Sequence, residues 1–273
     1  MENKKNTISA CLVVYNEEKV IEKCLASIKN LVDEIIVVHD GECNDNTLEI
    51  AKKYTDKIFV REHAGIMEAH LVFAYEQTSS EWILRIDADE YFDEVNLPKI
   101  KDSINNENIN LYKFKWEMWN GFKSVYFNGL SKECLFRKKD YHFCGIPHSS
   151  GWSDGEKGNL DIFLHHRPAY NNIVWTSFFK KMKKWVPIHA KYFFSDLVNY
   201  DCFQVDNDVW KLKTEKIKKY LFFYIIFEPF KNFVGQIKNG LWKSWTGFNI
   251  ALQQYVYYTV LYWKVWKIKK RKK

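Results

Sequence analysis

An apolar run that stops at three carboxylates is the feature that most constrains how this chain can fold. Residues 82–86 are mostly apolar and rich in β-forming side chains, and Asp87, Asp89 and Glu90 follow at once. A buried strand delivers acidic groups to the rim of a sheet in this way. Two aspartates separated by one residue leave the strand end together, and their hard oxygen atoms suit Mg²⁺ or Mn²⁺ holding a diphosphate. The alternative is a solvated acidic turn, because the D-x-D spacing is short.

Three earlier apolar runs predict neighbouring strands of the same sheet. They cover residues 8–14, 34–38 and 57–60, and helical periodicity fills the intervals at residues 20–30, 48–54 and 65–77. Strand and helix in alternation predict an α/β fold with a doubly wound, mostly parallel sheet. Ligands of such sheets bind outside the carboxyl ends of the strands.

The loops after these strands carry the polar residues. Residues 15–17 follow the first strand, Asp40 follows the second, and residues 87–90 follow the fourth. Three loops that converge on one edge favour a ligand site over surface decoration. The chain has no G-x-G-x-x-G after the first strand and no G-x-x-x-x-G-K-[ST] anywhere, which disfavours dinucleotide and P-loop chemistry.

Charge divides the chain into two regions. From residue 209 onward there are 15 Lys and Arg against two acids, a balance of +13, and because the whole chain is +7, residues 1–208 sum to −6. The basic tail argues against a general nucleic-acid binder and for a local anionic partner. The six cysteines form no C-x-x-C pair, so we expect reduced, mostly buried thiols of a cytoplasmic protein.

The order of the loop motifs resembles a known family. Tyr-Asn-Glu-Glu at residues 15–18, an acidic loop after Val38 and Asp-Ala-Asp-Glu at residues 87–90 are similar to the GT-A glycosyltransferases of family 2. The small bacterial enzymes of lipopolysaccharide-core glucosyltransferase type show the same pattern. The resemblance is clear over residues 7–95 and weaker through residues 135–137, 145–148 and 164–166.

This resemblance implies a fold, a division into domains and an activity. The fold is a GT-A domain over residues 1–170, with a nucleotide-binding half at 1–95 and an acceptor half at 96–170, followed by a helical extension at 171–273. The activity is metal-dependent, inverting transfer of a sugar from a nucleotide donor, with UDP-sugars favoured, to a cell-envelope glycan or glycolipid. The cofactor is Mn²⁺ or Mg²⁺.

The same resemblance implies roles for individual residues. Contact with the nucleotide sugar falls to Val14, Tyr15, Asn16, Glu17, Asp40, Asp87 and Ala88, and the metal falls to Asp87 and Asp89, with His166 or His165 completing the shell. One departure is His39, which replaces the first acid of the usual Asp-Asp pair. A lone histidine is also often structural, so ligation by either histidine stays open.

A second departure concerns the catalytic base. Relatives carry His-Glu where this chain has His148 and Ser149, and an inverting transferase needs a carboxylate to accept the proton of the acceptor. Asp154, in a turn-rich loop, and Glu133 are the candidates, with Glu156 as a further substitute. A solvated turn acid is the alternative reading of each.

Aromatic residues mark the acceptor half and the tail. Trp116, Trp119 and Trp152 are candidates for stacking on sugar rings, against the alternative of buried core aromatics. Helices are expected at residues 175–187, at 209–227 with a break at Pro229, and at 241–268. Trp and Tyr prefer the membrane interface and a polybasic end attracts anionic lipid, so we expect peripheral binding to the inner face of the cell membrane. The alternative is an aromatic helix packed on the catalytic domain.

Two other function classes compete with the transferase. One is a catalytically silent sugar-nucleotide-binding or scaffold protein that kept the fold and lost the base at Ser149. The other is a nucleotidyltransferase, which would want a glycine-rich basic loop after the first strand, and that loop is absent from the sequence.

Overall fold

The computed structural model describes residues 6–127, 130–143, 151–171, 173–194 and 207–272, with the backbone only for residues 207–210. Two compact units divide the chain. The first comprises Met1–Met118, Leu130–Ala169 and Tyr200–Val205, and the second comprises Trp119–Gly129, Tyr170–Asn199 and Asp206–Lys273. Each unit is described by itself.

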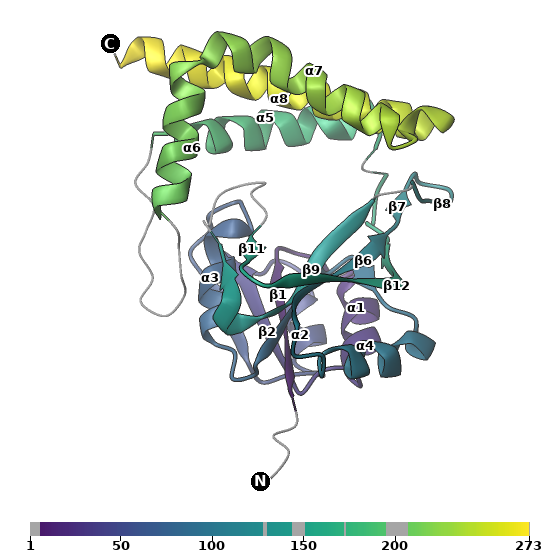
Figure 1. Cartoon of the computed structure of the whole chain (residues 1–273). Coiled ribbons are helices and arrows are strands. Elements are labelled where there is room, and N and C mark those ends of the chain that lie inside the picture. The colour runs from purple at the N-terminus through teal and green to yellow at the C-terminus, as the bar shows by residue number, and fades with distance from the viewer. Residues whose placement is uncertain (1–5, 128–129, 144–150, 172, 195–206, 273) are drawn as a thin grey trace. The chain divides into compact units, whose positions relative to one another are not determined.

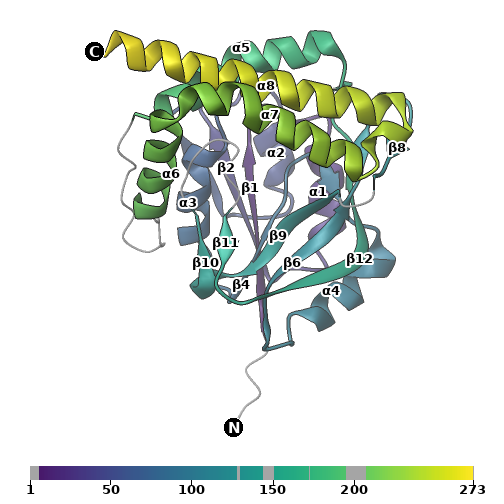
Figure 2. The same cartoon turned by 45° about the horizontal axis from the view of Figure 1, so that its top comes forward.

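The first unit is built on an eight-stranded sheet with the order β3-β2-β1-β4-β9-β6-β12-β5. Its strands are β1 (Ile8–Val14), β2 (Glu34–Asp40), β3 (Ile58–Arg61), β4 (Trp82–Arg85), β5 (Glu90–Tyr91), β6 (Ile109–Trp116), β9 (Ser131–Arg137) and β12 (Glu156–His166). Strands β1 to β4 pair in parallel, as do β6 and β12, whereas β9 and β5 run antiparallel to their neighbours. Figure 2 shows β4, β9, β6 and β12 side by side. The predicted α/β class with a mostly parallel, doubly wound sheet is confirmed.

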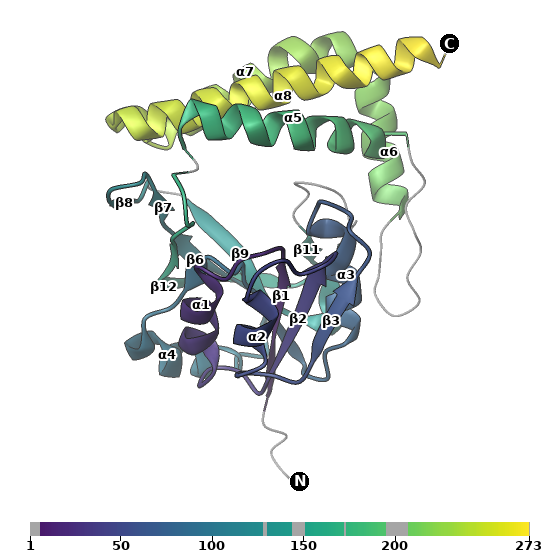
Figure 3. The same cartoon turned by 180° about the vertical axis from the view of Figure 1, so that it is seen from behind.

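Helices cover both faces of this sheet because successive strand residues point in opposite directions. Along β1, Ala10, Leu12 and Val14 join the cluster that packs on α1 (Ile21–Ile28), α2 (Thr47–Ala51) and α4 (Leu97–Ser103). Cys11, between them, joins the cluster that packs on α3 (Glu68–Glu76). Figure 3 shows α1 and α2 in front of β1 and β2. Burying a valine or leucine side chain such as Val14 or Leu12 contributes about 1.5–3 kcal/mol, and the packed layers fix where the strands end.

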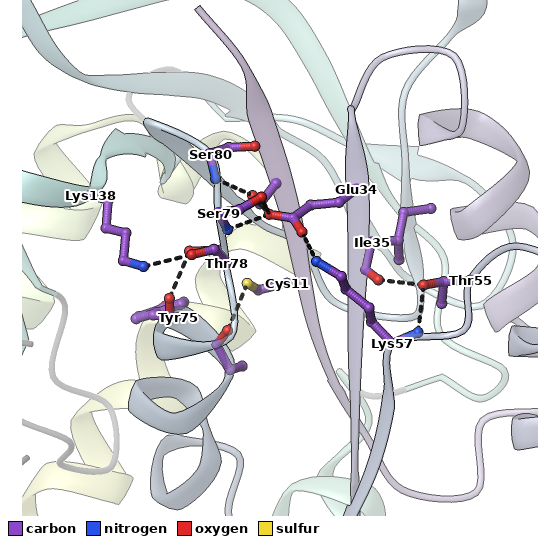
Figure 4. A network of polar contacts seen from close by, with 12 residues as sticks. Cys11, Glu34, Ile35, Thr55, Lys57, Tyr75, Thr78, Ser79, Ser80 and Lys138 are labelled. Carbon is purple, nitrogen blue, oxygen red and sulfur yellow. Dashed lines mark hydrogen bonds and ion pairs between the residues drawn. The ribbon is translucent and has the colours of Figure 1, made fainter. Parts of the chain in front are cut away.

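A polar network ties β2 to the chain segment before β4 at the amino ends of these strands (Figure 4). Glu34 begins β2, and its carboxylate accepts hydrogen bonds from the hydroxyl of Ser9, the amide of Ser79 at 2.6 Å and the ammonium of Lys57. The Ser80 amide donates to the Ser9 hydroxyl at 3.2 Å. This edge lies opposite the carboxyl ends of the strands, so the network serves the fold and leaves the other edge open for the acidic loops.

The remaining strands and turns outside the large sheet are short, and residues 124–125 among them belong to the second unit. They are the 3-10 turns η1 (Glu94–Asn96) and η2 (Lys138–Asp140), the strand pair β10 (Tyr141–His142) with β11 (Trp152–Ser153), and the strand pair β7 (Met118–Trp119) with β8 (Ser124–Val125). Residues 109–119 form two strands, because the chain leaves the large sheet at Glu117, between β6 and β7.

The second unit is helical, as the sequence predicted for the C-terminal region. Its helices are α5 (Trp175–Tyr192), α6 (Asn207–Lys219), α7 (Leu221–Lys238) and α8 (Trp245–Arg271), with a 3-10 turn η3 (Leu241–Lys243) between the last two. Figures 1 and 3 show α7 and α8 lying side by side. Gly240, with φ of 95°, ends α7 in the left-handed conformation that favours glycine, and the Ser244 hydroxyl caps α8 by accepting from the Gly247 amide.

Both expected helix ends at prolines were wrong. Pro187 lies inside α5, and Pro229 lies inside α7, while the break falls at Tyr220 between α6 and α7. A proline removes one backbone hydrogen bond and does not by itself end a helix whose flanking residues are held by packing. Val186, His189 and Ala190 are buried around Pro187, and Pro229 is itself buried.

Two predictions about the whole chain can be compared with the described residues. Cys11, Cys24, Cys43 and Cys134 are free thiols, three of them buried, and Cys144 and Cys202 lie outside the described residues. Over the same described ranges, no helix is both long enough and apolar enough to cross a bilayer.

Candidate active site

The acidic turn after β4 is held by a lysine from the neighbouring strand. The Lys132 ammonium on β9 lies 2.6 Å from a carboxylate oxygen of Asp87 and 2.6 Å from one of Glu90. Burial raises the pKa of Asp87, but Lys132 outweighs it and the pKa falls below its usual value. Burial raises the pKa of Glu90, which the lysine only partly offsets. The turn is therefore a compact charged cluster under the rim of the sheet.

Asp89 leaves this cluster and meets a histidine from β12. The Nε2 atom of His166 lies 3.2 Å from an Oδ atom of Asp89, and the Arg167 amide donates to the Asp89 carbonyl at 2.7 Å. Antiparallel pairing of β12 with β5 sets His166 opposite Glu90. The Trp116 ring packs on His166 with centroids 5.0 Å apart, and its Nε1 donates to Glu90 at 2.8 Å. The turn before β5, the end of β12 and the end of β6 thus hold the Asp89 carboxylate and the His166 imidazole next to each other.

The residues present can be tested for their fit to a divalent cation. Asp87 and His166 each keep one buried polar atom that has no hydrogen-bond partner among the described residues, Oδ1 of Asp87 and Nδ1 of His166. The described residues contain no cluster of three or more His, Cys, Asp or Glu that could hold a metal ion. Mg²⁺ is usually bound by one or two carboxylates together with substrate phosphates, so the pair of Asp89 and His166 fits only as part of a shell that a bound diphosphate would complete.

His165 lies apart from the pair formed by Asp89 and His166. Its Nδ1 atom is 2.7 Å from a carboxylate oxygen of Glu117, its Nε2 atom is 2.9 Å from one of Asp93, and its ring stacks on Tyr91. Adjacent residues of a strand point to opposite faces, which separates the two histidines. The geometry therefore favours His166 over His165 as a metal ligand.

Asp40 ends β2 and is occupied by donors from the chain itself. Its carboxylate accepts from the amides of Ala64 and Gly65 at 2.6 and 2.9 Å and contacts Nε2 of His70 at 2.8 Å. Burial raises the pKa of Asp40, but these hydrogen bonds outweigh it and hold the pKa below its usual value. Asp40 thus fixes the loop before α3, and its side chain is only 6% exposed.

The loop after β1 offers a ring and backbone groups to a ligand. Tyr15 is 44% exposed, and its ring lies 4.9 Å from the His63 ring. Asn16 adopts a left-handed φ of 54°, and its amide donates to Nε2 of His39 at 3.3 Å. His39, the departure from the family pattern, is fully buried and donates from Nδ1 to the Gly41 carbonyl at 2.8 Å. The histidine that replaces an acid therefore shapes the backbone of both loops.

Other members of the predicted nucleotide set act through the backbone or the loop. Val14 and Ala88 are buried in the core, at 3% and 5% exposure, so their side chains face away from the rim. The Glu17 amide donates a hydrogen bond to the Thr47 hydroxyl at 2.6 Å. The Asn46 amide donates to the Glu18 carboxylate at 3.1 Å, and the Glu18 amide donates to the Asp45 carboxylate at 3.1 Å. The loops after β1 and β2 are thereby fixed to each other.

The prediction of Asp154 as the base requires a correction. Asp154 precedes the first residue of β12, whereas His166 is the last, and the strand spans 11 residues. At about 3.3 Å per residue, Asp154 lies roughly 30 Å from the end that carries His166. Its carboxylate instead contacts Nε2 of His142 at 2.6 Å. The sequence could not show that this loop meets the opposite edge of the sheet.

Glu133 and the histidine-serine pair complete the list of predicted base positions. The Glu133 carboxylate is bound by the Lys157 ammonium at 2.9 and 3.0 Å, which leaves it paired. His148 and Ser149 lie outside the described residues. Among the candidate stacking residues, Trp116 supports His166, Trp152 stacks on His142 at 5.3 Å, and Trp119 is half-buried.

The comparison with known families now bears on this site. The model of glycosyl transferase family 2 matches residues 9–153. The chain belongs to glycosyl transferase family 2. This stretch covers more than half of the chain and contains all but the first residue of β1, the loop at Asp40 and the Asp87 to Glu90 turn, so the resemblance to the GT-A enzymes of that family is confirmed.

Curated relatives of the family-2 chain align over a short stretch only. An uncharacterized glycosyltransferase of Rickettsia typhi is 40% identical over 83 residues, which are 30% of this chain and 28% of that protein. The SPbeta prophage-derived glycosyltransferase SunS of Bacillus subtilis is 36% identical over 100 residues, 34% of this chain and 22% of that one. The chain thus spans less than a third of the length of these relatives.

A solved structure is similar to the family-2 chain at a low level. Glucosyl-3-phosphoglycerate synthase from Mycobacterium tuberculosis, in complex with Mg²⁺ and uridine diphosphate, is 27% identical, covers 41% of this chain and 44% of its own, and superposes with a TM-score of 0.35. A score that low carries no conclusion about this chain's ligands.

Sequence reasoning missed the residues that arrange the acids. Lys132 lies outside the apolar runs that predict the strands of the sheet, and only the pairing of β9 with β4 brings it to the acids. The first three residues of β9, Ser131 to Glu133, are all polar and do not alternate with apolar residues, so the local sequence gives no strand signal for Lys132. His70 lies in a helix whose apolar positions alone were considered, and only the fold brings it to Asp40.

Proposed function

We propose that this chain is a metal-dependent, inverting glycosyltransferase that moves a sugar from a UDP-sugar to a glycan or glycolipid of the cell envelope. The observation that carries the proposal is the meeting of Asp89 and His166 at 3.2 Å beside the buried cluster of Asp87, Glu90 and Lys132. An acid and an imidazole at the carboxyl edge of a parallel sheet suit a cation that binds a diphosphate.

The chemistry needs one bond to form as another breaks. The acceptor oxygen bonds to the anomeric carbon, the bond from that carbon to the diphosphate breaks with its electron pair on the diphosphate, and the acceptor proton passes to a carboxylate. Mn²⁺ or Mg²⁺, held by Asp89 and His166 with Asp87 beside them, would stabilise the charge that develops on the leaving group. Lys132 keeps Asp87 ionised and in place.

The nucleoside would lie over the loops after β1 and β2. Tyr15 offers an exposed ring, and the backbone of Asn16 and Glu17 is fixed by His39 and Thr47. Asp40 supports this pocket indirectly, because its carboxylate is already bound by Ala64, Gly65 and His70. Preorganised groups of this kind reduce the ordering that binding would otherwise require.

Asp93 is the proton acceptor in this proposal. It lies four residues after Asp89, its side chain is 53% exposed, and it is 2.9 Å from Nε2 of His165. The Nδ1 atom of His165 is in turn 2.7 Å from Glu117. An exposed carboxylate whose orientation is set by a histidine is a candidate for the general base, and the assignment rests on that exposure and that contact.

The catalytic domain is proposed as residues 1–170 and the helical extension as residues 171–273, with the extension binding the membrane surface from the inner, cytoplasmic side. The support is the concentration of basic and aromatic residues after residue 209. Peripheral binding would bring the transferase to a lipid-linked acceptor.

The proposal is tested by incubating the protein with UDP-sugars and Mn²⁺ and measuring the release of UDP. Asp89→Ala is expected to lower kcat/KM at least about hundredfold, because the cation loses a protein ligand. Asp102→Ala, an exposed acid on α4, is the matched control and should leave the rate within about twofold. Nucleotide binding without turnover across donors and acceptors would instead favour the catalytically silent protein.

A further inference from the structure

Helix α7 carries a row of exposed apolar side chains along one face. Phe222, Phe223, Ile226, Phe227 and Phe230 are 74%, 61%, 43%, 48% and 57% exposed. Their spacing of one, three and four residues puts all five on one side of a helix. Buried Leu221 and Pro229 lie elsewhere on the same helix, so α7 has an inner side packed in the second unit and an outer apolar side. We name these five residues the α7 stripe.

A basic pocket adjoins the stripe at its amino-terminal end. It measures about 310 Å³ and is lined by Lys218 and Lys219 from α6, Leu221 and Phe222 from α7, and Trp266, Lys269 and Lys270 from α8. Phe222 belongs to both the pocket and the stripe. The Lys269 ammonium donates to the Lys218 carbonyl at 2.6 Å, which ties α8 to the end of α6, and Lys270 lies over the Trp266 ring at 4.0 Å.

Among the residues that the structure describes, none of the four pocket lysines makes an ion pair with a carboxylate. Glu228, the acid on α7, pairs with Lys231. Four cations around one concavity repel one another, and an anion that enters it relieves that repulsion. A phosphate group is the anion whose charge and acceptor oxygens match several ammonium groups.

We propose that the α7 stripe lies in the surface of an anionic phospholipid membrane while the pocket of Lys218, Lys219, Lys269 and Lys270 binds a lipid phosphate headgroup. An interfacial helix buries its apolar face at the boundary of headgroups and acyl chains, and flanking lysines reach the phosphates. A second copy of this chain is disfavoured as the occupant, because pairing two stripes would bring two basic pockets together. The inference deepens the proposed function by assigning its membrane surface, and it can be tested without turnover.

The test is co-sedimentation of the full chain with vesicles of phosphatidylcholine, with and without 30% phosphatidylglycerol. Each lysine near an anionic surface is expected to strengthen binding about fivefold, so changing all four to Gln should weaken binding more than about hundredfold. The matched control changes Lys52, Lys53, Lys99 and Lys101, which are exposed on the first unit, to Gln and should weaken binding much less. If both quadruple variants lose vesicle binding equally, the pocket is not the site that binds the lipid phosphate.

The stripe is tested by Phe223→Ser with Phe227→Ser, against Phe122→Ser at an 89% exposed position. The double variant should bind vesicles at least about tenfold more weakly, and its deficit should persist at high salt, because the lost contribution is apolar. If Phe122→Ser does the same, or if the chain forms dimers through α7 without vesicles, the membrane assignment fails.

Two further measurements distinguish a lipid phosphate from free phosphate and check that the active site is intact in the lysine variant. Inorganic phosphate at 10 mM should not saturate the pocket in calorimetry without vesicles; saturable binding would make it a site for free phosphate. Binding of UDP with Mn²⁺, measured by thermal shift, should be unchanged in the lysine variant. If the lysine variant loses vesicle binding and still binds UDP, the result supports the pocket and is compatible with the proposed function. If the unaltered chain does not bind UDP, only the proposed function is refuted.

Discussion

At the scale of residues, the pair of Asp93 and His165 makes a prediction that separates chemistry from binding. Asp93→Asn should lower kcat at least about hundredfold while leaving the affinity for UDP within about twofold, because the amide cannot accept the acceptor's proton. Glu94→Gln, at the next exposed acid, is the control. The measurement is steady-state kinetics together with UDP binding; a loss of affinity equal to the loss of rate would show that Asp93 acts in donor binding.

Lys132 makes a prediction about stability that involves one buried and one partly buried carboxylate. Lys132→Met removes the ammonium 2.6 Å from both Asp87 and Glu90 and should cost about 3 kcal/mol, since the buried Glu90 and the partly buried Asp87 both lose their counter-charge. The deficit should shrink as the pH falls toward 4, where protonation removes the unpaired charges. Urea unfolding measures this, with Lys113→Met on β6 as the control. A variant as stable as the parent at pH 7 would show that the cluster is solvated.

The same residues show what a sequence can and cannot fix at this scale. The position of Asp87 and Asp89 at the end of a strand could be predicted because a strand and the acids that follow it are contiguous in the chain. To choose between His165 and His166, one must know to which face of β12 each side chain points. To place Asp154, one must know in which register β12 pairs with β6. Neither facing nor register is written in a single segment, because each depends on which strand pairs alongside.

At the scale of elements, the network at the start of β2 predicts how stability varies with pH. Burial raises the pKa of Glu34, but hydrogen bonds from Lys57, Ser9 and Ser79 outweigh it and lower the pKa from 4.5 to about 2. A depressed pKa in the folded state contributes stability that is present above about pH 4.5 and is lost as the pH falls toward 2. At neutral pH this contribution is about 2–3 kcal/mol.

Glu34→Gln should therefore lower the free energy of unfolding at pH 7 by about 2 kcal/mol and converge with the parent near pH 2–3. Glu107→Gln, an exposed acid before β6, serves as the control and should have no pH-dependent effect. Chemical denaturation at several pH values gives the comparison. A constant difference across pH would mean that packing, and not the charge of Glu34, ties β2 to residues 79–80 (Figure 4).

Element prediction succeeded where one buried face set the pattern and failed at prolines. The strands β1, β2 and β4 and the helices between them followed from apolar runs and loop residues. Helix α5 passes through Pro187 and helix α7 through Pro229 because buried neighbours hold the chain helical on both sides. Local rules describe what a proline costs, and tertiary packing decides whether the helix tolerates that cost.

At the scale of the whole molecule, the net charge of each part of the chain matches the function that we propose for it. The acidic part of the chain, residues 1–208, carries the rim with Asp87 and Asp89, and the basic part carries the α7 stripe and its lysine pocket. An acidic rim binds a diphosphate only with a cation between them, whereas a basic pocket binds a phosphate directly. The two ends of the chain thus require different partners for ligands of the same charge.

This division predicts that two ligands stabilise the protein independently. UDP with Mn²⁺ at 100 times its Kd should add about 2.7 kcal/mol to the unit that binds it, and vesicles with phosphatidylglycerol should add a separate increment. Asp89→Ala should remove the first increment alone, and the quadruple lysine variant the second alone. Because the altered residues lie in different units, the effects should add within about 0.5 kcal/mol. Thermal unfolding with each ligand and with both measures this. A larger departure from additivity would mean that the membrane surface and the donor site are coupled, so that docking itself regulates transfer.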